Sequence, residues 1–289
     1  MKSRIIMITG VLLATWNTAV LADCSREGLK TNVEQYFSAL AKHDTSAVPL
    51  AGNVRFTENG HELETGEGFW QSAGAVQFSR DVLDIGICGS VTQAVIEENG
   101  RNILFGVRLQ LNDQQQISEI EHIIAREEEF AFTPDNVLNS GWQDWERSLE
   151  NPQRTSRAAM RAAANDYFDM FAADPDVSAP FAFPCHRWEN GFHTTARNGN
   201  CSPTGLVIIH GERRVPVIDR ETGVAVAFVH FARNLPDMHM FKFRSGQIEL
   251  VQAVIGKGGA GIMGWGDDKT LSRRVPAEGE QMSPSLLEQ

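Results

Sequence analysis

The tripeptide Glu58-Asn59-Gly60 recurs 131 residues later as Glu189-Asn190-Gly191, and Tyr36-Phe37 recurs at the same spacing as Tyr167-Phe168. An apolar pattern follows the same offset: Ile117, Ile120, Ile123 and Ile124 align with Ile248, Val251, Val254 and Ile255. A helical pair, a polar turn and an apolar pattern that share one offset indicate two copies of one domain.

Each copy combines a helix with a run of strands. Residues 25–43 and 156–173 carry apolar side chains at helical spacing. Strand patterns follow, such as the alternating segment 103–111 after the Asn99-Gly100 turn. In the second copy, strands are predicted near 206–210, 214–218, 224–233, 238–244 and 248–255. The stretch from Pro49 to Gly60 is predicted to be rich in loops, and residues 185–195 are predicted to form a turn. This order predicts an α+β fold of two tandem cone-shaped domains, each a curved antiparallel sheet wrapped around N-terminal helices. The mouth of such a cone is a natural pocket for a small molecule.

The chain begins with a segment typical of an export signal. Lys2 and Arg4 precede an apolar stretch, and Val20-Leu21-Ala22 offers a cleavage site. A membrane anchor is the alternative, but the apolar stretch is too short to span a bilayer. We predict five segments: a signal peptide at 1–22, a first cone domain at 23–127, a linker at 128–155, a second cone domain at 156–266 and a flexible tail at 267–289.

Charge and cysteine content limit the partners and the compartment. Without the signal peptide the chain holds 24 basic and 37 acidic residues, a net charge of −13. An acidic chain without a basic run is a poor ligand for nucleic acid or a membrane surface, so we expect neither as a partner. Export, to the periplasm or the medium, permits disulfides. Cys185 and Cys201 flank a short polar loop and are predicted to pair, with two buried thiols as the alternative; the pairing of Cys24 and Cys88 stays open.

Two longer segments carry a resemblance to a known family. Phe183-Pro184-Cys185-His186-Arg187-Trp188-Glu189-Asn190-Gly191 and Arg213-Arg214-Val215-Pro216-Val217-Ile218-Asp219 resemble a tandem-domain branch of secreted proteins in the nuclear transport factor 2-like (SnoaL-like, ketosteroid-isomerase-like) superfamily. Gly264-Trp265 also matches the branch, although the residues before it depart from the pattern. The resemblance covers about residues 24–266 and implies association through open sheets, as an internal pseudo-dimer or a homo-oligomer. The superfamily includes isomerases, dehydratases, epoxide hydrolases and binding domains, so the fold alone does not choose the chemistry.

The second copy holds most of the candidate catalytic residues, including five of the eight histidines. Histidine supplies acid–base chemistry near neutral pH, while arginine and asparagine side chains can stabilise a developing oxyanion. We predict a catalytic group of His186, Arg187, Glu189, Asn190, His193 and His230. We predict a substrate-binding group of Trp188, Phe228, His239, Phe241 and Arg214.

Structural alternatives accompany these assignments. Asn190 could serve only turn chemistry, and His230 and His239 could be core histidines on apolar strand faces. The first copy offers its own candidates, which are Glu58, Asn59, Arg80 and Glu121. Glu121 and His122 are neighbours on a predicted strand and must point to opposite faces.

Metal ions and organic cofactors are not expected. His186, His230, His239 and Glu189 have suitable ligand chemistry, but no local metal-binding spacing exists. Gly256-Lys257-Gly258-Gly259-Ala260-Gly261 satisfies the dinucleotide glycine pattern, but the residues that follow do not predict the helix that a pyrophosphate needs.

These patterns predict an exported lyase, dehydratase or isomerase that uses general acid–base chemistry on a largely apolar or aromatic substrate in a cone pocket. A hydrolase remains open within the same class. The alternative is a non-catalytic periplasmic protein that binds a small molecule or acts as a scaffold. Histidine content favours the second copy as the active one, and the sequence leaves the substrate and the reaction type open.

Overall fold

The computed structural model describes residues 24–172, 177–202, 207–258 and 263–266. The predicted signal peptide and tail, at 1–22 and 267–289, lie outside the described residues. Within the described part of the chain, no helix combines the length and apolar character that crossing a membrane requires.

The first unit is a helix followed by a six-stranded sheet. Helix α1 (Arg26–Lys42) begins after Ser25, whose hydroxyl accepts a hydrogen bond from the Gly28 amide. The other elements are η1 (Thr45–Ala47), β1 (Leu50–Glu58), β2 (His61–Leu63), η2 (Gly68–Gln71), β3 (Ala73–Asp84), β4 (Gly89–Glu98), β5 (Arg101–Leu111) and β6 (Ile117–Ala125). The strand order is β2-β1-β6-β5-β4-β3, with β1 parallel to β6 and the other pairs antiparallel.

The second unit repeats this plan. Its elements are α3 (Arg157–Asp169), η4 (Met170–Ala172), β7 (Phe181–Glu189), β8 (Phe192–His193), β9 (Arg213–Asp219), β10 (Val224–Phe231), β11 (Leu235–Arg244) and β12 (Gln247–Ile255). The strand order β8-β7-β12-β11-β10-β9, with β7 parallel to β12, is the order of the first sheet. The α+β prediction of two tandem cones is therefore confirmed, but each sheet is mixed and not wholly antiparallel, as β1 and β7 pair parallel to the last strand of their sheets.

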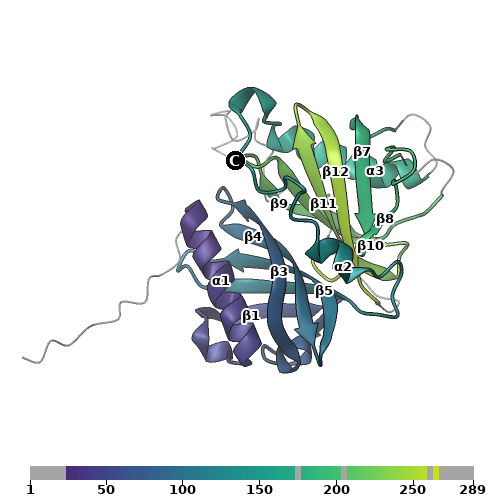
Figure 1. Cartoon of the computed structure of the whole chain (residues 1–289). Helices are drawn as coiled ribbons and strands as arrows, with labels where there is room; N and C mark the ends of the chain where they lie inside the picture. The colour runs from purple at the N-terminus through teal and green to yellow at the C-terminus, as the bar shows by residue number, and fades with distance from the viewer. Residues whose placement is uncertain (1–23, 173–176, 203–206, 259–262, 267–289) are drawn as a thin grey trace, which may run out of the picture.

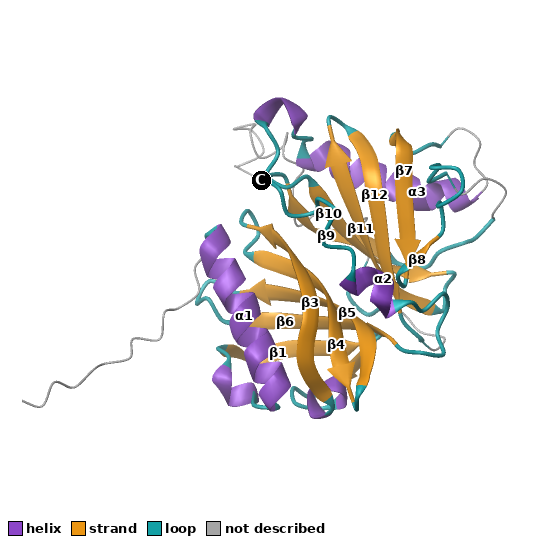
Figure 2. Cartoon of the chain, in the orientation of Figure 1, coloured by secondary structure: helices purple, strands orange, loops and turns teal. Residues whose placement is uncertain are grey.

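The segment between the units carries α2 (Pro134–Leu138) and η3 (Asn151–Gln153). Figure 2 shows α2 at the junction of the two sheets. The side-chain amide of Asn136 donates to the Gly191 carbonyl oxygen at 2.9 Å, which ties α2 to the turn after β7. Of the two tryptophans in this segment, Trp145 is buried, whereas Trp142 is 73% exposed.

Each sheet has two covered faces, which we name by what they contact. The inner face packs on the unit's own helix, α1 or α3, and forms the interior of the cone. The outer faces of the two sheets pack on each other and form a third apolar cluster, which includes Val91, Leu104, Val226 and Met240. The units thus lie sheet against sheet (Figure 1), and the internal pseudo-dimer implied by the family resemblance is present.

Some strands differ from the sequence-based expectation. β1 and the second half of β7 fall in segments that we expected to be loop and turn, because Gly52 and the Glu-Asn-Gly tripeptides favour turns. The strand predicted at 206–210 is wrong for 207–210, which form no regular element. β11 begins at Leu235, three residues before the predicted strand at 238.

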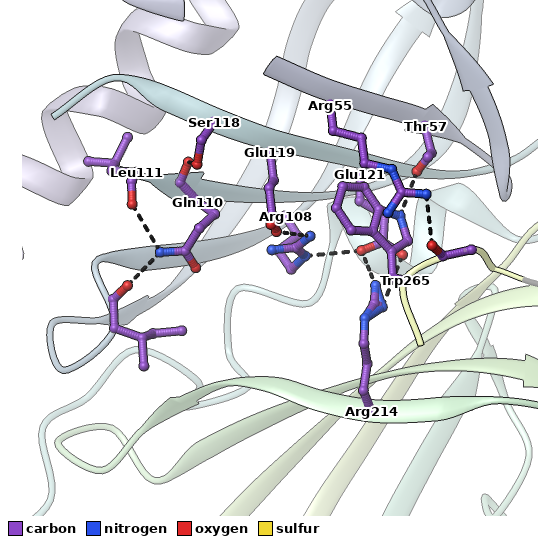
Figure 3. Close-up of polar contacts among 12 residues, drawn as sticks. Arg55, Thr57, Arg108, Gln110, Leu111, Ser118, Glu119, Glu121, Arg214 and Trp265 are labelled. Carbon is purple, nitrogen blue, oxygen red and sulfur yellow. Dashed lines mark hydrogen bonds and ion pairs between the residues drawn. The ribbon is translucent and has the colours of Figure 1, made fainter. Parts of the chain in front are cut away.

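A charged cluster crosses the interface between the outer faces (Figure 3). Glu121 of β6 has no exposed side-chain surface, and its Oε2 lies 3.0 Å from Nε of Arg108 on β5. Arg214 of β9, in the other unit, contacts both carboxylate oxygens of Glu121. One buried carboxylate therefore joins guanidinium groups from both sheets.

Trp265 covers this cluster from the segment that follows the last strand. Its ring centroid lies 4.0 Å from the guanidinium carbon of Arg55 and 4.7 Å from that of Arg108. The indole Nε1 donates to Thr57 Oγ1 at 3.0 Å, and Arg55 donates to the Gly264 carbonyl oxygen at 2.7 Å. The end of the second unit is thereby fixed to the first sheet.

We expect Glu121→Ala to lower the free energy of unfolding by about 3–5 kcal/mol, because it removes the carboxylate that pairs with the buried Arg214 and leaves the buried Arg108 with only Glu119. Glu119→Ala is the matched control: Glu119 also pairs with Arg108, at 2.8 Å, but its side chain is 39% exposed. Its loss should be about 1 kcal/mol or less. Chemical denaturation followed by tryptophan fluorescence measures both, and equal losses would contradict the central role of Glu121.

Candidate functional site

The first cone is filled by its own aromatic side chains. Tyr36, Phe56, Phe69, Trp70 and Phe105 are each 1% exposed or less. Phe69 and Trp70 come from η2, which packs on the sheet and buries both rings. The interior of this cone is a closed apolar core.

One histidine lies inside this core. His122 of β6 is fully buried, and its Nε2 lies 2.6 Å from the Tyr36 hydroxyl oxygen. Burial lowers the pKa of His122 to about 3, so its ring is neutral at physiological pH.

The second cone holds a buried carboxylate–imidazole pair. Asp237 and His239 lie two residues apart on β11 and therefore share its inner face. Oδ1 of Asp237 is 2.8 Å from Nδ1 of His239, and both side chains are at most 1% exposed. Burial raises the pKa of Asp237, and the neighbouring His239 opposes part of that rise. Neither Oδ2 of Asp237 nor Nε2 of His239 has a hydrogen-bond partner within the described structure.

A second polar group lies on the same inner face. Arg187 of β7 donates to the Tyr167 hydroxyl oxygen at 3.2 Å, and its Nε is 3.2 Å from Oε1 of Glu189. Burial raises the pKa of Tyr167 to about 12, with Arg187 opposing the rise, so the phenol stays protonated. The rings of Tyr167 and His239 have centroids 5.5 Å apart, which brings the two polar groups together.

A further histidine, His210, reaches this cone from the segment before β9. Its ring packs against Phe168, Phe171 and Phe231, with centroids 5.4, 5.2 and 4.5 Å away. Burial and the nearby His239 lower the pKa of His210 to about 4. Its Nδ1 accepts from the Ala232 amide at 3.3 Å, while its buried Nε2 has no partner among the described residues.

The first copy shows that the cone fold does not require these ionisable groups. Asp237 pairs with Ile255 in the second sheet, and Phe105 pairs with the equivalent Ile124 in the first, so Asp237 and Phe105 hold equivalent positions. The same comparison of register makes His239 equivalent to Val107. Arg187 corresponds to Phe56 at the 131-residue offset. Three apolar core positions of the first cone are therefore charged or titratable in the second.

Several predicted site residues lie on the outer face instead. His186 and Trp188 alternate with the inner residues Cys185 and Arg187 along β7, so their side chains point away from the cone. His193 stacks on Trp188, with ring centroids 4.3 Å apart. The predicted catalytic group thus divides between two faces of one sheet.

The outer face also carries other predicted residues. Arg214 pairs with Glu121, and its guanidinium lies 5.1 Å from the Phe228 ring centroid. Arg80 donates to Ser140 Oγ and to Gln143 in the interface. His230 shares a face of β10 with Phe228 and lies away from the second cone. Of the predicted binding residues, His239 and Phe241 face the cone and stack on each other at 5.8 Å.

The repeated Glu-Asn-Gly turns are tied to the last strand of each sheet. Asn190 adopts a positive φ of 44°, donates to the Phe130 and Ile255 carbonyl oxygens and accepts from the Ile255 amide. Asn59 makes the same contacts with Ile124. Every polar atom of the Asn190 side chain is engaged, which leaves it no free donor for a substrate. Glu58 accepts from the Phe69 amide at 2.7 Å.

Two disulfides are present. Cys185–Cys201 is confirmed, and Cys24–Cys88, which the sequence left open, links the start of the first unit to the β3–β4 turn.

The metal ligands considered in the sequence do not come together in this cone, and the groove that the structure shows lies elsewhere. The structure separates His186 from His239, and within the described residues no three His, Cys, Asp or Glu side chains converge on a metal position. A groove lined by Glu98, Arg101, Arg126, Glu129 and Lys257 lies beside the first unit, and its charged lining is unsuited to an apolar substrate.

Comparisons with known proteins concern the fold. Residues 153–255 match a family model described as "Domain of unknown function (DUF8021)", which covers the second unit. No curated protein matches the chain.

Three solved structures are similar at low identity. An NTF2-like protein of unknown function from Cytophaga hutchinsonii is 16% identical, covers 33% of this chain and 88% of its own, and has a TM-score of 0.27. An NTF-2 like protein from Burkholderia xenovorans is 13% identical over 43% of this chain and 97% of its own, with a TM-score of 0.28. A protein with a cystatin-like fold from Methylobium petroleophilum is 8% identical over 38% and 83%, with a TM-score of 0.32.

We expect Asn190→Ala to destabilise the protein more than Asn99→Ala. Both asparagines have a positive φ, 44° and 51°, so both variants carry the same backbone strain. Asn99 is exposed in a hairpin turn, whereas Asn190 would lose three buried hydrogen bonds. The difference in the free energy of unfolding should be about 1–3 kcal/mol. Equal stability of the two variants would show that the side-chain hydrogen bonds of Asn190 do not stabilise the fold.

We expect His122 to make folding sensitive to acid. Its pKa is about 3 in the folded protein and about 6.5 in the unfolded chain, so only the unfolded chain takes up the proton as pH falls below 6.5. Stability should therefore fall by up to about 1.4 kcal/mol per pH unit between pH 6 and 4 from this group. His122→Gln should remove that slope, and Tyr36→Phe, which keeps the ring buried, should retain it. Urea titrations at several pH values measure the slopes; an unchanged slope in His122→Gln would contradict the assignment.

Proposed function

We propose that the second cone is an acid–base site that transfers a proton on a small, largely apolar substrate, without an organic cofactor. The best support is that ionisable side chains of the second cone replace apolar core side chains at equivalent positions of the first. Asp237, His239 and Arg187 occupy positions held by Phe105, Val107 and Phe56 in the first cone. Burying ionisable groups costs free energy, and a cone that folds without them has no structural need of them.

His239 is the proposed base. Burial raises the pKa of Asp237, but His239 opposes that rise, and we propose that the carboxyl is ionised. An ionised carboxylate can only accept hydrogen bonds, so Asp237 then fixes the hydrogen of His239 on Nδ1. Nε2 of His239 then presents its lone pair to the interior of the cone. Its register partners on the two adjacent strands, Ala227 and Ala253, place no atoms beyond Cβ beside the ring.

His210 and Tyr167 are the proposed donors. Because Nδ1 of His210 accepts from the Ala232 amide, its neutral ring carries the hydrogen on Nε2. The Tyr167 hydroxyl accepts from Arg187 and keeps its own hydrogen for a developing oxyanion. A lone pair and two donors in one buried cone suit removal of a proton next to a carbonyl, the step shared by isomerases and dehydratases.

The disulfides support the predicted export of the chain. Two disulfides favour an oxidising environment, and we propose the periplasm or the extracellular space as the site of action. Phe168, Phe171, Phe231 and Phe241 surround the polar groups, which favours a largely apolar or aromatic substrate.

A probe of proton transfer tests this without the natural substrate. We expect the protein to accelerate exchange of the α-hydrogens of apolar ketones, such as 2-tetralone, for deuterium in D₂O, followed by proton NMR. Asp237→Asn and His239→Gln should each lower the catalysed rate by about 100-fold or more, because they remove the base or its orientation. The His186→Ala/His193→Ala double variant, altered only on the outer face, should keep the wild-type rate.

Circular dichroism establishes that each variant is folded. Binding of the ketones in saturation-transfer NMR without any exchange would assign the cone to the second candidate function, a small-molecule binding protein. Equal exchange rates in wild type and His239→Gln would refute the proposed base.

A further inference from the structure

Two histidines that the proposed chemistry does not use lie together on the outer face of the second sheet. His186 is on β7, two residues before Trp188, and His193 of β8 is the register partner of Trp188. The backbone therefore holds both rings on the same side of the sheet, and both are half-buried. Nδ1 of His186 is 3.2 Å from Nε2 of His193.

We propose that this pair is a binding site for one divalent transition-metal ion of the kind that prefers imidazole, such as Zn²⁺ or Ni²⁺. Metal–nitrogen bonds of about 2.05 Å from both rings would meet at one ion with an angle of roughly 100°. That angle lies between those of square-planar and tetrahedral coordination. The spacing of the two nitrogens therefore fits a bidentate chelate.

The same spacing leaves room for only one hydrogen between the two nitrogens. One of the two nitrogens accordingly accepts that hydrogen bond with its lone pair. The other nitrogen frees its own lone pair when its ring changes tautomer and carries the hydrogen on the far nitrogen. A metal ion replaces the shared hydrogen and satisfies both nitrogens.

Aromatic packing pre-orients the ligands. The His193 ring stacks on Trp188 at 4.3 Å with an angle of 17° between the planes, and the His186 centroid is 5.9 Å from that of Trp188. Trp142, from the segment between the units, packs edge-on against Trp188 at 6.2 Å. Little ring motion remains to be restricted when an ion binds, which favours affinity.

The site is separate from the cone. His186 and His193 lie on the outer face, whereas His239 lies on the inner face of the same sheet. Two protein ligands leave the remaining positions of the ion to water or to an external ligand. The inference does not depend on the proposed acid–base function, and its test needs no turnover.

Isothermal titration of the tag-free chain with NiCl₂ and ZnCl₂ tests the proposal, with MgCl₂ as an oxygen-preferring control ion. We expect one equivalent of Ni²⁺ or Zn²⁺ to bind and Mg²⁺ to give no signal. His186→Ala and His193→Ala should each weaken binding at least tenfold, while His61→Ala and His239→Gln should bind as the wild type does. Ni²⁺ should also quench part of the tryptophan fluorescence, because Trp188 lies against the site.

The wild-type chain supplies a test that no variant can confound. Bound Ni²⁺ should broaden the ring NMR signals of two histidines selectively at one equivalent. No binding by the wild-type chain, or equal affinity in a His186→Ala/His193→Ala double variant that remains folded, would overturn the proposal.

Discussion

The packing of the two outer sheet faces against each other is the constraint on which the rest of this molecule depends. Glu121 lies in this interface with no exposed side-chain surface and pairs with Arg108 from its own sheet and Arg214 from the other. A buried charge is costly unless it is paired, so each of these three side chains depends on its partners. The pairing therefore specifies the relative position of the two units as well as stabilising it. The face of each sheet that a single-domain protein would expose is used inside this one chain.

The interface follows an approximate two-fold relation. Arg80 and Arg214 hold equivalent register positions on β3 and β9. Arg214 reaches Glu121 on the other sheet, whereas Arg80 donates to Gln143 of the segment between the units. Gln252, the counterpart of Glu121 at the 131-residue offset, accepts from Gln93 and donates to Gln143. An isologous contact of this kind is what two identical subunits would form, and here the copies have diverged so that one side uses a carboxylate and the other an amide.

The repeat, the helices and most hairpins could be predicted from sequence, because they depend on local periodicity and turn chemistry. The candidate site could be predicted only in part. Alternation along β7 already separates His186 and Trp188 from Arg187 and Glu189, so the sequence contained the signal that divides the predicted group. Asp237 lies outside the strand predicted at 238–244, and it was therefore not among the candidates, although β11 begins at Leu235. The partners of Arg80, Glu121 and Arg214 lie in other segments, and no local pattern reveals them. The unbroken apolar run at 224–229 was the available signal that the sheet is covered on both faces.

The two copies differ in what their interiors bury. The first cone buries Phe56, Phe105 and Val107 and can contribute apolar burial at each of these positions. The second cone has Arg187, Asp237 and His239 instead, and each must be kept in a protein interior that disfavours charge. Because the outer faces couple the two sheets through Glu121 and Arg214, loss of either unit's packing exposes the other's apolar outer face. The stability of the apolar copy can therefore offset the cost of burying ionisable groups in the neighbouring copy.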